Sequence, residues 1–245
     1  MDLDTALLAA CCEGRVLPTV RVYGWSQPAI TVGYSQRYES ELDVERCRAE
    51  GIDIVRRPTG GRALLHHREL TYAVVAPVSL APFDRGLKAT FGAISEALLA
   101  GLGNLGIRGA INAHKRPPSG GPRRSPACFA ALNHCEITVD GKKLVGSAQK
   151  RTAGAFLQHG SVIIDSDHER FTSLLKFDDE EQRRTVRRQL MNSTTSLNQV
   201  CNSPVTFEEV AVALQEGFMS TFKGGWEVIP SSGAECIGIG DEISF

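Results

Sequence analysis

The pair Asp140-Gly141 constrains the fold of this chain more than any other short feature of its sequence. An alternating run, Glu136-Ile137-Thr138-Val139, precedes the pair, and a second run that begins at Lys142 follows it. Glycine accepts the positive φ that a tight hairpin turn demands, so the pattern predicts two antiparallel strands joined by a two-residue turn. The return strand continues into small residues at 146–148, which would let a ligand or another backbone approach closely.

The predicted hairpin carries a possible pair of reactive groups. Side chains alternate across a strand, so only one of Lys142 and Lys143 can face the interior. Leu144 lies on the opposite face from Lys143, and the pattern does not decide which lysine points inward. Cys128 lies shortly before the hairpin. A thiol beside an inward amine would form a nucleophile with its proton partner, but periodicity does not establish that the two meet.

The rest of the chain alternates between strand and helix patterns. Strands are predicted at 19–25, 29–34, 52–56, 63–66, 69–75 and 154–165. Helices are predicted near the start of the chain and at 41–50, 87–105, 167–175, 179–191 and 206–222. We expect 63–66 and 69–75 to be the two arms of a hairpin. The fold class that results is α+β, a mixed and largely antiparallel sheet flanked by helices.

Length and composition limit the classes of protein to which the chain can belong. Its 245 residues make one large domain, or one domain with a small appendage. The net charge of −1 gives no case for a nucleic-acid or membrane binder. No apolar run reaches the roughly 18 residues that are needed to span a bilayer. The start, MDLDTALLAACCEG, lacks the basic region of a signal peptide and is typical of an amphipathic helix.

The seven cysteines are scattered along the chain and odd in number. In the absence of an export signal they are expected to be reduced thiols of a cytoplasmic protein. No CxxC pair occurs, so a structural zinc site is not expected.

The stretch from Arg56 to His67, RRPTGGRALLHH, is the second informative part of the chain. Its two adjacent glycines would let backbone N–H groups approach an anion or a carbonyl, and the flanking arginines add charge-assisted donors. A sharp turn between strands, with arginines at the surface, fits the same residues. The stretch lacks the spacing of a Walker loop or a dinucleotide fingerprint. His159, in LQHGS further along, fits either an acid/base group or a hydrogen-bonded, partly buried histidine.

Four segments together resemble a known superfamily. YGWSQPAITVGYSQ, DIVRRPTGGRALLHHRELTYAVV, ACF followed by EITVDGKKLVGSAQKR, and LQHGSVIID occur in the order and spacing of the lipoate/biotin protein ligases and octanoyltransferases. Within that superfamily the chain is most similar to the cysteine-dependent octanoyltransferases of the LipM type. The resemblance covers roughly residues 1 to 220. RRPTGGR and GKKLVGSAQ are its specific parts, and the Gly-Arg-Gly-Arg loop of biotin ligases is absent.

The resemblance implies roles for individual residues. The lysine of the family's Gly-x-Lys-[Ile/Leu]-x-Gly-Ser-Ala context corresponds to Lys143 rather than Lys142, and the nucleophilic cysteine, in an Ala-Cys-Phe context, corresponds to Cys128. The walls of the acyl pocket and its substrate-binding groups would be Arg57, Thr59, Gly60, Gly61, Arg62, His66, Gly146, Ser147, Ala148, His159 and Gly160. No cofactor and no metal are implied.

The sequence also departs from the family at two places near these residues. The family usually has a Pro-Ser-x-Tyr-Glu run after Cys-Phe, where this chain has LNHCE at 132–136. His67 replaces an acidic residue that follows the histidine in the family. Both departures concern the walls of the pocket rather than the class of reaction. Cys135, the rival thiol, is interpreted as structural because it belongs to the predicted hairpin strand.

The resemblance further implies a fold and an activity. The fold would be the catalytic domain shared with class II aminoacyl-tRNA synthetases and biotin ligases, at 1–222, followed by a tail at 223–245 that is too short for an accessory domain. The activity would be transfer of octanoyl from acyl carrier protein, through a thioester on cysteine, to a lysine of a lipoyl domain. That acceptor would be the glycine cleavage H protein or a 2-oxoacid dehydrogenase E2. The alternatives are an ATP-dependent lipoate–protein ligase and an amidotransferase that moves octanoyl between lipoyl domains.

The resemblance also implies that both partners, acyl carrier protein and the lipoyl domain, are acidic. They would have to be attracted by local basic clusters, because the chain is nearly neutral overall. One cluster, formed by Lys115, Arg116, Arg123 and Arg124, lies in the segment before Cys128. The other lies in the predicted helix at 179–191 and is formed by Arg183, Arg184, Arg187 and Arg188. For the helix, an ordinary solvated face is the favoured interpretation.

Overall fold

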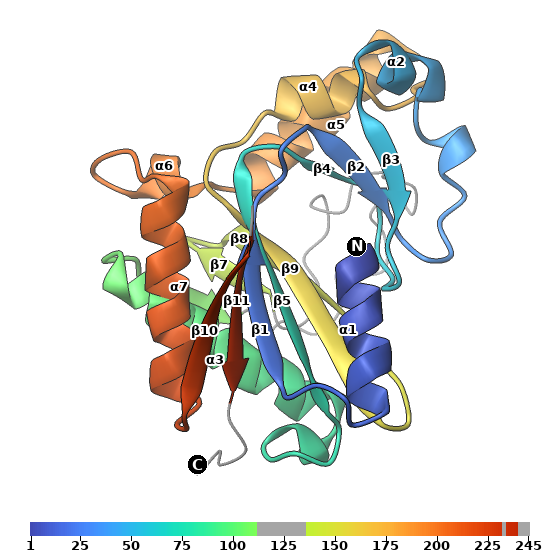
Figure 1. Ribbon diagram of the computed structural model, residues 1–245. Helices are drawn as coiled ribbons and strands as arrows, with labels where there is room; N and C mark the ends of the chain where they lie inside the picture. Colours follow the sequence, from blue (N-terminus) through green and yellow to red (C-terminus); the bar gives the residue numbers. More distant parts are fainter. Residues whose placement is uncertain (112–135, 232–233, 240–245) are drawn as a thin grey trace.

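An eight-stranded sheet runs through the centre of the computed structural model, which describes residues 1–111, 136–231 and 234–239 (Figure 1). Its strand order is β10-β11-β1-β5-β9-β8-β7-β6, and every neighbouring pair is antiparallel. The strands are β1 (Thr19–Tyr23), β5 (Glu69–Pro77), β6 (Ala110–Ile111), β7 (Ile137–Val139), β8 (Lys142–Arg151), β9 (Ala155–Ile163), β10 (Trp226–Ser231) and β11 (Ala234–Ile239).

A second sheet of three strands lies beside one end of the large one (Figure 1). It consists of β2 (Ala29–Val32), β3 (Asp53–Arg56) and β4 (Leu64–His66). β2 pairs parallel with β3 and antiparallel with β4. The two sheets together confirm the predicted α+β class with a mixed, largely antiparallel arrangement.

The hairpin at Asp140-Gly141 forms as predicted. Both turn residues have positive φ, 49° and 76°, the combination that a type I′ turn requires and that matches the twist of the flanking strands. Val139 pairs directly with Lys142 across the turn. One step further the register shifts, because Ile137 pairs with Val145 and Thr138 with Lys143, which leaves an extra residue on β8.

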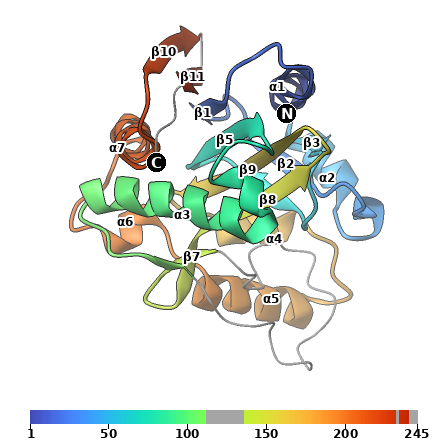
Figure 2. The same cartoon turned by 90° about the horizontal axis from the view of Figure 1, so that it is seen from below.

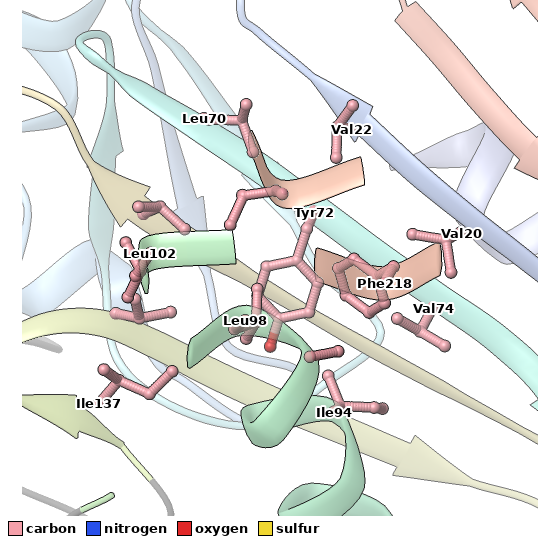
Figure 3. Packing of buried hydrophobic residues seen from close by; sticks show 14 of the residues in the cluster. Val20, Val22, Leu70, Tyr72, Val74, Ile94, Leu98, Leu102, Ile137 and Phe218 are labelled. Atoms are coloured by element: carbon pink, nitrogen blue, oxygen red, sulfur yellow. The ribbon is translucent and has the colours of Figure 1, made fainter. Parts of the chain in front are cut away.

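Helices cover both faces of the large sheet. α3 (Leu87–Asn104) and α7 (Phe207–Thr221) lie side by side on one face, and α1 (Asp2–Cys12) lies on the other (Figure 2). β5 lies between these layers and is buried on both faces, so its apolar residues are continuous rather than alternating. Toward α3 and α7, Tyr72 and Phe218 meet at the centre of the largest apolar cluster (Figure 3).

The remaining helices pack around the small sheet and along one edge of α7. These are α2 (Val44–Ala49), α4 (His168–Ser173), α5 (Glu180–Ser193) and α6 (Leu197–Val200), with short 3-10 turns at Tyr38–Ser40 and Phe83–Arg85. A separate apolar cluster joins the small sheet to α2, α4 and α5. No helix in the described ranges is both long and apolar enough to cross a membrane.

The predicted hairpin of 63–66 and 69–75 is wrong. β4 pairs with β2 in the small sheet, whereas β5 pairs with β1 and β9 in the large one. The physical reason is that both hydrogen-bonding edges of β5 are occupied, one by β1 and the other by β9, so no edge is left for β4. The two residues between β4 and β5 therefore carry the chain from one sheet to the other.

The segment after residue 222, expected to be a tail, contributes two strands to the large sheet. β10 and β11 pair with each other, and β11 pairs with β1 over Thr19 to Tyr23. The main sheet therefore continues past the boundary predicted at residue 222.

The close packing of α3 on α7 depends on glycine and yields a stability prediction. A Cβ on Gly101 would lie 2.7 Å from the carbonyl oxygen of Ala213, while a Cβ on Gly92, in the same helix, would meet nothing within 4 Å. Gly101→Ala should lower the free energy of unfolding by about 1–3 kcal/mol because the two backbones must separate. Gly92→Ala should raise it by about 0.5–1 kcal/mol through the lower entropy of the unfolded chain. Urea denaturation of both variants measures the difference, and equal effects would contradict it.

Candidate active site

A cavity of about 220 Å³ lies between the two sheets. The large sheet contributes residues of β8 and β9 to its walls, and the small sheet contributes β4 and the loop that precedes it. Of the residues predicted to form the site, those that line the cavity are Arg57, Gly60, Gly61, His66, Lys143, Gly146, Ser147, Ala148, His159 and Gly160. Segments up to about 100 positions apart in the chain thus meet around one space.

Lys143 faces this cavity and Lys142 does not. Lys143 is 1% exposed and its Nζ lies 2.5 Å from Oε1 of Glu136, which is 2% exposed, whereas Lys142 is exposed. The extra residue on β8 explains this orientation. Leu144 and Val145 are consecutive, yet both belong to the apolar cluster beneath α3 and α7. Lys143 and Gly146, one on each side of them, both face the cavity.

The small residues of β8 and β9 allow the two strands to form the cavity wall. A Cβ on Gly160 would lie 2.3 Å from the carbonyl oxygen of Gly146 and 2.8 Å from Cε1 of Tyr72. The hydroxyl of Tyr72 lies 2.6 Å from Oγ of Ser147 and accepts from Nε2 of Gln158. Burial raises the pKa of Tyr72 to about 12, so this hydroxyl stays protonated and serves as a hydrogen-bond donor.

The loop that opens with Arg57 is held from within by the guanidinium of that residue. Arg57 is 6% exposed, and it donates to the carbonyl oxygens of Thr31, Gly60 and Arg62 and to the hydroxyl of Thr31. The carbonyl of Gly61 packs so closely on Gly33 that a Cβ there would lie 2.0 Å from the oxygen. The sequence is compatible with arginines at the surface, but Arg57 is buried. Its hydrogen bonds hold a tightly packed turn together, and we call this set of bonds the Arg57 brace.

Two buried histidines connect the small sheet to the large one. His66, on β4, bonds through Nδ1 to Glu69 of β5 and through Nε2 to the hydroxyl of Thr31, 2.7 Å away. Trp25 stacks on its ring at 4.3 Å between centroids. His159, on β9, bonds through Nε2 to the hydroxyl of Thr59 in the loop, also at 2.7 Å. Burial lowers the pKa of His159, so its ring is neutral near pH 7.

Comparison with known proteins places this architecture in a family. The chain matches the family described as "Lipoyl protein ligase A/B catalytic domain" over residues 1–219. It belongs to that family. Proteins named "Octanoyltransferase LipM" are among its relatives. That of Kyrpidia tusciae is 42% identical over 224 residues, which is 89% of this chain and 80% of that protein. That of Bacillus subtilis is 35% identical over 221 residues, with the same two coverages, 89% and 80%.

Solved structures of lipoate protein ligases share the fold. A bipartite lipoate protein ligase from Thermoplasma acidophilum superposes with a TM-score of 0.68 at 24% identity, over 90% of this chain and 79% of that one. A lipoate-protein ligase A bound with ATP gives a TM-score of 0.66 at 24% identity, over 88% and 78%. The predicted family is therefore confirmed, and the chain has the fold of lipoate protein ligases.

Two of the predicted site residues lie elsewhere than in the cavity wall. Arg62 pairs with Glu41 at 3.5 Å and lines a separate hollow with Lys176 and Phe177. Thr59 is 1% exposed and lies behind the wall, where it bonds to His159. The sequence TGGR alone does not show that its arginine lies at the surface of the loop and its threonine inside the loop.

Cys128, Cys135 and the basic cluster at 115–124 lie outside the described residues. The second basic cluster, on α5, is largely neutralised: Arg183 and Arg184 pair with Glu180, and Arg187 pairs with Glu169. These pairs favour the interpretation of α5 as a solvated helix face. Within the described part of the chain, no three His, Cys, Asp or Glu side chains are grouped so that they could hold a metal ion.

Sequence reasoning missed three buried carboxylates near the cavity: Asp4, Glu69 and Glu136. Each stands beside apolar residues in a segment correctly predicted as a helix or strand, where a charged side chain is rarely buried without a partner. Periodicity gives no sign of these contacts, because it indicates which face of an element a side chain occupies and not which side chain of another element lies opposite it.

The brace formed by Arg57 can be tested against its neighbour Arg62. Arg57→Lys should lower the free energy of unfolding by about 1–3 kcal/mol, because an ammonium cannot reach three carbonyl oxygens and a hydroxyl at once. Arg62→Lys, at a partly exposed position, should change it by less than about 0.5 kcal/mol. Thermal or urea unfolding of both proteins is the measurement, and an Arg57→Lys protein as stable as the parent would refute the brace.

Proposed function

We propose that this chain is an octanoyltransferase of protein lipoylation, which moves octanoyl from acyl carrier protein to the ε-amine of a lysine on a lipoyl domain. The observation that carries the proposal is the side chain of Lys143, an amine held at the wall of a cavity in a member of the lipoyl ligase A/B family. Relatives named octanoyltransferase support octanoyl as the acyl group that is transferred, since they align with most of this chain at 35–42% identity.

The proposed reaction has two steps, each of which exchanges one bond to the acyl carbon. The thiolate of Cys128 attacks the octanoyl thioester, a C–S bond to the enzyme forms, and the carrier's sulfur leaves as a thiolate as its C–S bond breaks. The lysine amine of the acceptor then attacks the acyl-enzyme, an amide C–N bond forms, and the Cys128 sulfur leaves with the proton that the amine loses. No ATP is consumed, because the thioester is already activated.

Lys143 is proposed to serve both steps. An ammonium near a thiol lowers the thiol pKa and so increases the thiolate that attacks. In the second step the same group would pass a proton from the incoming amine to the leaving thiol. Glu136 supports this role by holding the amine at the cavity, since a buried ammonium requires a partner.

An ATP-dependent lipoate–protein ligase is the competing activity, because solved structures of such ligases share the fold. The experiment that separates the two is the intact mass of the chain after incubation with octanoyl-acyl carrier protein without ATP. A transferase gains one octanoyl group, whereas a ligase, which makes an acyl-adenylate from ATP and the free acid, forms no covalent octanoyl-enzyme.

The nucleophile is tested by substitution of two cysteines. Cys128→Ala should abolish both the octanoyl-enzyme and the transfer to a lipoyl domain, because no other thiol is expected at the acyl carbon. Cys135→Ala should retain most of the activity. Mass spectrometry follows the first product and a gel-shift or mass assay of the lipoyl domain follows the second. Full activity of Cys128→Ala would refute the acyl-enzyme.

The two neighbouring lysines give a matched pair of variants. Lys143→Met should slow both acylation and deacylation by about 10² to 10⁴-fold, the usual loss when a positioned acid/base group is removed. Lys142→Met, at an exposed position, should have little effect. Single-turnover kinetics of each step is the measurement, with circular dichroism to verify folding. Equal losses in the two variants would show that Lys143 has no special role.

A further inference from the structure

A buried series of polar groups connects α1 to the loop above the cavity. Asp4 is 0% exposed; its carboxylate accepts from the guanidinium of Arg21 and, at 2.8 Å, from the hydroxyl of Tyr23. The same carboxylate lies 3.8 Å from Nδ1 of His159. On its other side His159 bonds through Nε2 to Thr59. None of these contacts belongs to the proposed chemistry at Lys143.

The charges in this series determine where the single ring proton of His159 lies. Burial would raise the pKa of Asp4, but the neighbouring ring of His159 and the charge of Arg21 outweigh it, and the pKa falls below its usual value. Asp4 is therefore an anion, and His159 is neutral near pH 7 because burial lowers its pKa. A carboxylate near Nδ1 attracts an N–H and repels a lone pair. The proton thus lies on Nδ1, and Nε2 accepts from the hydroxyl of Thr59.

His66 shows the same arrangement at full hydrogen-bond contact. Its Nδ1 bonds to the carboxylate of Glu69, and its Nε2 to Thr31. The hydroxyl of Thr31 already accepts from Arg57, so its own proton is available for Nε2 of His66. The two histidines that line the cavity therefore each have a carboxylate on the Nδ1 side and a threonine hydroxyl on Nε2.

The bond from His159 to Thr59 holds the loop that faces the cavity. Thr59 belongs to the loop that precedes β4 of the small sheet, and His159 belongs to β9 of the large sheet. The bond therefore joins the two sheets. Next to it, the carbonyl of Thr59 accepts from the backbone N–H of Tyr34 at 2.9 Å. Gly60 and Gly61, the following residues, line the cavity directly. A change in the direction of the Thr59 hydroxyl would therefore shift Gly60 and Gly61 in the cavity wall.

We propose that Asp4 is a positioning residue of this site: it fixes the His159 ring with its proton on Nδ1, so that Nε2 holds Thr59 and the loop of Gly60 and Gly61 over the cavity. The consequence for octanoyl transfer rests on the proposed function. The placement of the ring proton does not, and it is measured separately.

The experiment is ¹⁵N NMR of the histidine ring nitrogens in the full chain, together with single-turnover octanoyl transfer. In the parent protein, Nδ1 of His159 should be protonated and Nε2 unprotonated; His159→Gln identifies the signals. Asp4→Asn presents an amide N–H₂ toward Nδ1, because the guanidinium of Arg21 can only donate and therefore keeps the remaining oxygen at the Oδ1 position. The hydroxyl of Tyr23, which faces the Oδ2 position, can turn to accept from the amide. The proton should then move to Nε2, as happens when the aspartate of a serine protease triad becomes asparagine. Transfer should slow by about 10²-fold, while Asp2→Asn, at an exposed position of the same helix, changes neither measurement.

Thr59→Val provides a second arm that leaves the pair of Asp4 and Arg21 intact, in case Asp4→Asn does not fold. It should slow transfer to a similar extent while the proton stays on Nδ1, and Thr59→Ser should restore most of the rate. A proton on Nε2 in the parent, an unchanged ring in a folded Asp4→Asn protein, or full activity of Thr59→Val would each overturn the proposal. A parent protein that transfers no octanoyl would refute the proposed function, and the NMR result would still decide whether Asp4 sets the ring proton.

Discussion

The extra residue on β8 is the constraint on which the cavity depends. The turn at Asp140-Gly141 fixes Val139 opposite Lys142, and regular alternation from there would place Lys143 and Val145 on one face. The bulge breaks that alternation, so Leu144 and Val145 both enter the core beneath α3 and α7 while Lys143 turns to the cavity. Bulges commonly re-aim a side chain in this way near functional sites. A strand without the bulge would leave the ammonium among the apolar side chains of the core.

The second requirement of the site is that two sheets stay in fixed relation around an open space. Apolar packing cannot fill the cavity, so polar contacts across it carry the alignment. His66 with Glu69, and His159 with Thr59, cross from one sheet to the other, and Arg57 keeps the intervening loop rigid. Such contacts are directional, and each leaves a buried group unsatisfied when a partner is removed. Their geometry is therefore more sharply defined than that of an apolar interface of the same size.

The sequence predicts the local elements well and their assembly less completely. The hairpin at Asp140-Gly141 and the long helix at 87–105 follow from turn chemistry and periodicity, which are local properties. The separation of β4 from β5 does not, because both segments have strand patterns and their pairing partners, β2 for one and β1 and β9 for the other, are not decided by local sequence. The inward orientation of Lys143 needed the resemblance to a family, since a bulge leaves no mark in the pattern. Asp4 could not be found by either route, because its partners lie 17 to 155 positions away in the chain.

The distribution of buried charge links these observations. In the described residues, the buried charged side chains are Asp4, Arg21, Arg57, Glu69, Glu136 and Lys143. All but Arg21 either line the cavity or contact a residue that does, and Arg21 pairs with Asp4, which lies beside His159 of the cavity wall. Removing ions from water is costly, and apolar residues of similar volume often give equal or greater stability. A protein selected for stability alone would spread few such groups through its core, whereas here they gather around one space. Their concentration is therefore explained by what the cavity must do: hold an amine in place, and keep the walls around it in a single arrangement.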